Sequence, residues 1–172
     1  MSTAALISVD EYLRTMYHPD CDYVDGEVIE RNLGEKQHGK LQAEIWHIFR
    51  LHRQEWATYA LIETRMQVAP RRFRIPDVCV YIGAEPPGAI LRTPPFICIE
   101  VLSPEDRLAR MQDRIDDYLK FGVPYVWVID PDSRRAWVYT ADGSREIKDG
   151  LLRTENPSLT INLAQIFASI SQ

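Results

Sequence analysis

The chain has 172 residues, of which 45% are hydrophobic and 26% are charged, and its formal net charge is −5. This composition is typical of a globular protein, and no apolar stretch approaches the ~20 residues that a membrane span needs. The acidic balance argues against a broad surface for the phosphates of nucleic acid, because such a surface needs clustered Lys and Arg.

The N-terminal part predicts two helices separated by a hairpin. Residues 8–11 (Ser-Val-Asp-Glu) fit a capping box that opens a helix through about Met16. The dipeptide Asp25-Gly26 is a turn signal within the strand-like segment 23–31, which predicts a β-hairpin. The spacing of apolar residues then predicts a long helix over about 36–55.

The middle of the chain predicts strands. Residues 59–68 are rich in strand formers, and residues 74–81 predict the next strand. Segment 83–95 is rich in proline and glycine, so we expect a loop. Residues 96–102 (FICIEVL) form an unbroken apolar run around one carboxylate, which is typical of a strand buried on both faces.

The C-terminal part predicts a helix, two strands and a short helix. The residue types of Ser103-Pro104-Glu105-Asp106 favour a helix start, and Gly122 ends that helix after Phe121. Its apolar stripe comprises Leu108, Met111, Ile115, Tyr118 and Leu119. Strands follow at 124–130 and 135–140, and a short helix at about 163–170.

This order of elements predicts one domain over residues 1–172, of the α/β class, with a mixed central sheet and helices on both sides. The N-terminus lacks a basic segment followed by a long apolar one, so we expect no signal peptide. The three cysteines have no ligand-like spacing, which fits small buried side chains in a reducing cytoplasm. We therefore expect a cytoplasmic protein with no membrane association.

Two carboxylates fall in strands that we expect to be buried. Asp77 lies near the start of segment 74–81, and Glu100 lies in the middle of segment 96–102. A buried carboxylate is costly unless it is paired, protonated or bound to a metal. Acids on two adjacent strands can converge on one cation, although a turn aspartate and an arginine-paired glutamate are the structural alternatives.

The arginines are bunched near these acids. Arg71, Arg72 and Arg74 precede Asp77, and Arg107, Arg110 and Arg114 follow Glu100. Two interpretations stay open: solvated surface charge, and a basic rim around an acidic site.

Several motifs resemble one bacterial family. PDV at 76–78, EVLSPEDR at 100–107 and DYLKFGVPYVWVIDP at 116–131 closely resemble the Uma-type putative restriction endonucleases, and YVDGE at 23–27 resembles their N-terminal motif. The resemblance runs from about Ser8 to Tyr139. That family is grouped with the PD-(D/E)XK nucleases, which implies a restriction-endonuclease-like core and magnesium-dependent hydrolysis of phosphodiester bonds.

The resemblance also implies roles for single residues. Asp77 and Glu100 would be the motif acids that bind Mg²⁺ or Mn²⁺, with the carbonyl of Val101 as a third ligand. The superfamily expects a lysine two residues after the glutamate, where this chain has Leu102. Uma-type proteins often place a lysine on the following helix, where this chain has Arg114. Arginine can stabilise phosphate charge, but its pKa above ~12 prevents it from acting as a base.

Two further residues, Glu27 and His38, complete the candidate site. Glu27, after the hairpin turn, is a metal or water ligand or an exposed strand acid. His38, at the start of the long helix, contacts phosphate or acts as an acid near neutral pH, or is a hydrogen-bonded structural histidine. We assign Tyr118, Trp127 and Trp137 to the core rather than to base stacking.

The leading hypothesis is a metal-dependent DNA endonuclease that acts as a homodimer, because a two-fold protein matches a two-fold duplex. Leu102 and Arg114 at the two lysine positions favour the alternative of a catalytically degenerate nuclease fold that binds nucleic acid or protein. A third hypothesis is an oligomeric structural protein.

Overall fold

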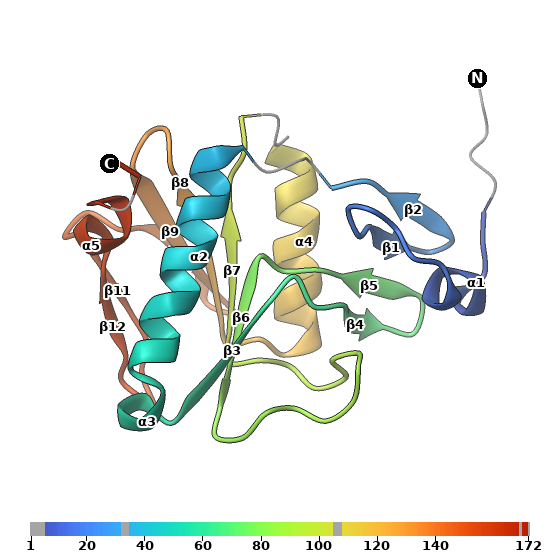
Figure 1. Ribbon diagram of the computed structural model, residues 1–172, viewed down its shortest axis with the longest axis horizontal. Helices are drawn as coiled ribbons and strands as arrows, with labels where there is room; N and C mark the ends of the chain where they lie inside the picture. The colour runs from blue at the N-terminus through green and yellow to red at the C-terminus, as the bar shows by residue number, and fades with distance from the viewer. Residues whose placement is uncertain (1–5, 32–34, 105–107, 169, 172) are drawn as a thin grey trace.

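The computed structural model describes residues 6–31, 35–104, 108–168 and 170–171. Its centre is a six-stranded mixed sheet in the order β10-β9-β8-β7-β6-β3 (Figure 1). The neighbours β7 and β8 run parallel, and the pairs on either side of them run antiparallel. The strands are β3 (Thr58–Ile62), β6 (Val78–Ile82), β7 (Ile97–Val101), β8 (Tyr125–Asp130), β9 (Arg135–Thr140) and β10 (Gly143–Glu146).

Helices cover both faces of this sheet, as expected for the α/β class. Helix α2 (Lys36–Leu51) and helix α5 (Leu163–Ala168) pack on one face, and helix α4 (Leu108–Phe121) packs on the other. Successive side chains of a strand point to opposite faces. Accordingly, Ile97 and Ile99 of β7 join the core under α2, whereas Cys98 joins the core under α4. Glu100 therefore faces α4.

A four-stranded antiparallel sheet lies beside the central sheet and carries the N-terminal hairpin (Figure 1). Its core is aromatic and consists of Tyr12, Tyr23 and Phe73. Its order is β2 (Glu27–Ile29), β1 (Asp22–Val24), β5 (Arg72–Arg74) and β4 (Met66–Ala69), next to helix α1 (Val9–Arg14). The remaining elements are α3 (Arg53–Trp56), β11 (Leu151–Arg153) and β12 (Thr160–Asn162).

Local signals in the sequence are confirmed where they concern caps and turns. The Ser8 hydroxyl accepts a hydrogen bond from the Glu11 amide at 3.1 Å and so caps α1. Asp25 and Gly26 have φ values of 52° and 110°, which a two-residue hairpin turn requires and glycine adopts without strain. No helix in the described ranges is long and apolar enough to cross a membrane.

Several element boundaries differ from the predictions. Segment 74–81 is not one strand: Arg74 ends β5, and β6 begins only at Val78 because Pro76 has no N–H for a ladder hydrogen bond. Segment 59–68 is likewise divided between β3 and β4, which belong to different sheets.

The two long helices also depart from the predicted ranges. The helix expected over 36–55 ends at Leu51, where α3 follows as a separate turn. Leu108 is 85% exposed, so it does not belong to the apolar stripe of α4. The expected start of α4 at Glu105-Asp106 lies outside the described residues.

Candidate active site

The sheet register brings the two candidate acids together. Strands β6 and β7 are antiparallel neighbours, with Val78 opposite Ile99. Continuing this register by one residue places Asp77 opposite Glu100. The side chain of Asp77 also contacts the backbone of β7 beside Glu100, because the amide of Val101 donates a hydrogen bond to Asp77 Oδ2 at 2.8 Å. Both acids are buried, with exposed fractions of 2% for Asp77 and 0% for Glu100.

Asp77 is held as a carboxylate by donors from three segments. Arg31 Nη2 lies 2.7 Å from Oδ1, and His38 Nε2 lies 3.1 Å from Oδ2. Burial alone would raise the pKa of Asp77, but the hydrogen bond and charge of His38, with the charges of Arg31 and Arg114, hold that pKa below its usual value. Asp77 is therefore ionised at neutral pH.

Glu100 occupies a different environment although it is an immediate neighbour. Tyr118 donates its hydroxyl to Oε1 at 2.5 Å, and Arg114 Nη1 lies 3.2 Å from Oε2. Burial raises the pKa of Glu100 to about 7, and the Asp77 charge adds to the rise while Arg114 and Tyr118 oppose it. Glu100 therefore holds a proton at neutral pH far more readily than Asp77.

Arg114 links the two acids to the four-stranded sheet that carries the N-terminal hairpin. Its Nη2 donates to the carbonyl of Ile75 at 2.8 Å, and its Nε lies 3.4 Å from Asp22 Oδ2. Burial alone would lower the pKa of Arg114, but the charges of Asp22 and Glu100 keep that pKa well above its usual value. The guanidinium therefore stays charged and cannot serve as a base. The arginine-paired glutamate that the sequence left open is therefore present, and the same ion pair orients Glu100.

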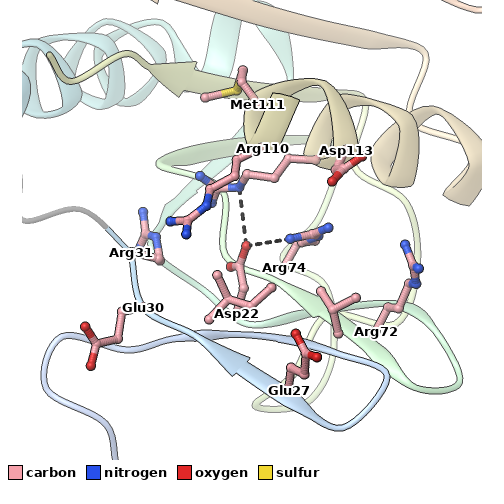
Figure 2. Close-up of a pocket in the computed structure, with 12 residues that line it drawn as sticks. Asp22, Glu27, Glu30, Arg31, Arg72, Arg74, Arg110, Met111 and Asp113 are labelled. Carbon is pink, nitrogen blue, oxygen red and sulfur yellow. Dashed lines mark hydrogen bonds and ion pairs between the residues drawn. The ribbon is translucent and has the colours of Figure 1, made fainter. Parts of the chain in front are cut away.

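A cleft of about 400 Å³ opens beside the acid pair, between the hairpin, β5 and α4 (Figure 2). Asp22 lies at its base, paired with Arg74 at 3.0 Å and with Arg114. Its lining includes five arginines and four acids: Arg31, Arg72, Arg74, Arg110, Arg114, Asp22, Glu27, Glu30 and Asp113. The arginines outnumber the acids here although the whole chain is acidic.

The donor chemistry of the acid pair fits a hard divalent cation. Such cations take carboxylate oxygens, and Mg²⁺ often uses only one or two carboxylates and keeps several waters. Glu100 Oε2 is buried and forms an ion pair with Arg114, but it accepts no aligned hydrogen bond from the described residues, so its capacity as an acceptor is not filled. Within those same residues, no group of three or more His, Cys, Asp or Glu side chains is placed to hold a metal. Any cation bound here would therefore have two carboxylates and complete its shell with backbone oxygen and water.

The structure brings together five of the six sequence-predicted site residues, with Val101 contacting Asp77 through its amide, and separates one. His38 and Arg114 contact Asp77 and Glu100, respectively, as described above. Glu27 has an exposed side chain that lines the cleft, and in the described part of the chain it contacts neither acid.

Sequence reasoning missed Arg31 and Asp22, and it placed Tyr118 only in the core. Arg31 and Asp22 flank the hairpin motif, so their position beside YVDGE was an available signal. Tyr118 is fully buried, as expected, but burial also raises the pKa of its hydroxyl, which keeps it a hydrogen-bond donor to Glu100. The helical spacing of Arg114 and Tyr118, four residues apart, predicts that they share a face, but not which acid they meet.

Comparisons with known proteins agree with this fold. Residues 9–169 match the family Uma2, described as "Putative restriction endonuclease". The chain is also similar in fold to a solved structure from Anabaena variabilis, a putative nuclease belonging to DUF820. The two chains are 24% identical, the match covers 95% of this chain and 99% of that one, and the TM-score is 0.83. No curated protein matches the chain. Because the family match spans nearly the whole sequence, the chain belongs to the Uma2 family, which is described as putative restriction endonucleases.

Proposed function

We propose that the protein is a metal-dependent endonuclease that hydrolyses phosphodiester bonds of DNA. Asp77 and Glu100 would form its active site. The observation that supports this most directly is the juxtaposition of two buried carboxylates at the ends of neighbouring strands, next to an arginine-lined cleft. Asp77 and Glu100 would hold Mg²⁺ or Mn²⁺, with the carbonyl of Val101 as the proposed third ligand. When bound, such an ion polarises the scissile phosphate and lowers the pKa of a coordinated water.

The chain's own residues would prepare the site for that ion. Val101 and His38 fix the carboxylate plane of Asp77, and Tyr118 fixes that of Glu100. Arg114 favours the ionised form of Glu100 and supplies a fixed positive charge beside it. Arginine binds phosphate with a planar fork of donors, so Arg114 can stabilise phosphate charge without taking part in proton transfer.

His38 holds a proton beside Asp77 more readily than a solvated histidine does. Burial alone would lower its pKa, but the hydrogen bond and charge of Asp77 raise it above its usual value. When the ring is protonated, its Nε2–H donates to Asp77, and the imidazolium compensates the negative charge of the pair.

The test is a cleavage assay on supercoiled plasmid DNA with Mg²⁺ or Mn²⁺. We expect Asp77→Asn and Glu100→Gln each to lower the rate roughly a hundredfold or more, because a bound metal contributes several kcal/mol to such reactions. Asp142→Asn, in an exposed turn, is the matched control and should cleave like the wild type. Circular dichroism would verify that each variant is folded. Equal rates for the wild type and both acid variants would contradict the proposal.

A second function is supported by a separate observation. Both oxygens of Asp77 already have donors, and Arg31, His38 and Arg114 balance the acids without a metal. This arrangement suits a catalytically degenerate fold that binds nucleic acid. Salt-dependent DNA binding that needs no metal and leads to no cleavage would favour this function over the first.

We also propose that the active form is a homodimer, since cutting two strands suits a two-fold protein. Sedimentation velocity of the 19.9 kDa chain distinguishes one copy from two.

A further inference from the structure

Two arginines belong both to the acid pair and to the cleft. Arg31 lies 2.7 Å from Asp77, and Arg114 lies 3.2 Å from Glu100, yet both line the 400 Å³ cleft, which neither of those acids lines. Their guanidinium groups therefore stand between the acids and the space that a ligand would enter. Arg31 is 12% and Arg114 is 14% exposed, so each retains a solvent-accessible part.

The cleft holds positive charge that its own acids do not fully pair. Asp22 serves both Arg74 and Arg114, and the latter has a buried Nε without a hydrogen-bond acceptor among the described residues. Arg110 is exposed and forms no ion pair within the described part of the chain. Figure 2 shows arginines reaching this space from three elements: the segment after β2, strand β5 and helix α4. An anion with several oxygens would satisfy these donors.

We propose that the arginine cleft binds a phosphodiester of a nucleic-acid strand, and that this phosphodiester takes Arg31 and Arg114 away from Asp77 and Glu100. The identity of the strand rests on the proposed function. Phosphate and carboxylate present similar oxygen pairs to the guanidinium fork, so the exchange replaces one charge-assisted hydrogen bond with another. The cleft is at the small end of ligand pockets, which suits one phosphodiester with its two sugars.

The exchange of arginine partners couples binding of the substrate phosphate to the state of the acid pair. With phosphate on the arginines, Asp77 Oδ1 and Glu100 Oε2 lose the guanidinium groups that occupy them, so both oxygens become accessible to a cation. Phosphate and cation would then bind cooperatively, each raising the affinity of the other by the same factor.

The test measures phosphodiester binding in metal-free buffer and does not depend on cleavage. The probe is the thymidine dinucleotide, which carries one phosphodiester, and the readout is the shift of arginine Nε–H signals in ¹H–¹⁵N NMR spectra. Arg110→Gln should weaken binding roughly tenfold, because a hydrogen bond to a charged group is lost. Arg50→Gln, an exposed arginine of α2, is the matched control and should bind like the wild type.

The direction in which the affinity for the dinucleotide changes in the two buried-acid variants is the decisive result. Asp77→Asn and Glu100→Gln remove the carboxylates that compete for Arg31 and Arg114, so each should bind the dinucleotide at least about fivefold more tightly than the wild type. Asp113→Asn removes an exposed acid that lines the cleft but forms no ion pair among the described residues. It should change affinity much less, although it lies closer to the ligand.

Several results would overturn the inference. One is the absence of saturable binding by the folded wild type. Others are an unchanged affinity in Arg110→Gln, or a gain in Asp113→Asn as large as in the two buried-acid variants. Binding of inorganic phosphate but not of the dinucleotide would assign the cleft to free phosphate instead. Since no metal is present, a failure of metal binding or of cleavage would refute the proposed function while leaving these results unaffected.

Discussion

At the scale of single residues, the two acids differ in how strongly their neighbours stabilise the ionised carboxylate. Asp77 contacts the Val101 amide, His38 and Arg31, and these partners hold its pKa below the usual value although burial opposes them. Glu100 accepts a hydrogen bond from the Tyr118 hydroxyl and pairs with Arg114, and burial raises its pKa to about 7. Two neighbouring carboxylates with pKa values pushed apart are a common feature of sites that bind cations or move protons.

The shift of Glu100 predicts a specific dependence of stability on pH. Its pKa in the folded protein lies above its ordinary value of 4.5, so between about pH 4.5 and 7 the folded state holds a proton that the unfolded state has lost. The free energy of unfolding contributed by this group therefore falls as pH rises through that window, and it levels off above it.

Glu100→Gln removes this dependence. The stability of the wild type minus that of the variant should fall by on the order of 2–3 kcal/mol from pH 4.5 to 8. Urea unfolding of both proteins at several pH values measures it. A difference that stays constant across this range would show that Glu100 is ionised at its ordinary pKa.

His38 supplies the converse prediction. In the wild type its pKa lies above 6.5, because Asp77 outweighs the effect of burial. In Asp77→Asn the burial is unopposed, so the pKa of His38 should drop below 6.5. NMR titration of the imidazole ring measures both values, with His38→Gln to assign the signal. An unchanged pKa in Asp77→Asn would mean that the two side chains do not interact in solution.

At the scale of elements, a buried ion network joins the second sheet to helix α4. Arg74 of β5 pairs with Asp22 of β1 at 3.0 Å and with Asp117 of α4 at 2.7 Å. Asp22 also accepts a hydrogen bond from the Ile75 amide at 3.1 Å. This network fixes the hairpin against α4 and thereby shapes the cleft.

Removing one member of this network should be costly. Asp22→Ala leaves Arg74 with one partner and leaves the Ile75 amide without its acceptor, so we expect a loss of about 3–5 kcal/mol in the free energy of unfolding. Asp10→Ala removes an exposed ion pair with Arg14 and should have little effect. Urea denaturation compares the two. Similar small losses in both variants would show that the network contributes no more than a surface pair.

The sequence predicts elements well where one physical signal dominates. The apolar run of β7 and the Asp25-Gly26 turn were both located correctly, because burial and a positive φ leave few alternatives. The boundary inside segment 74–81 was missed because strand-forming residues surround Pro76 and conceal the break. The partnership of Arg31 with Asp77 was not predictable, because it joins residues 46 positions apart through packing rather than through a local pattern.

At the scale of the whole molecule, charge is distributed unevenly. The chain carries a net charge of −5, yet five arginines meet in one cleft beside the two buried acids. Composition averages over this local concentration and so could not reveal it. Bunching along the sequence did indicate it, since Arg72, Arg74, Arg110 and Arg114 all line the cleft. Arg107 lies outside the described residues.

The central claim is that Asp77 and Glu100 together hold a divalent cation, and calorimetric titration of Mn²⁺ tests it most directly. The titration compares the wild type, Glu100→Gln and the control Asp142→Asn, each alone and with a saturating phosphorothioate oligonucleotide. We predict saturable binding by the wild type and the control that Glu100→Gln abolishes. Binding that survives in Glu100→Gln, or no binding by the folded wild type under either condition, would contradict the account.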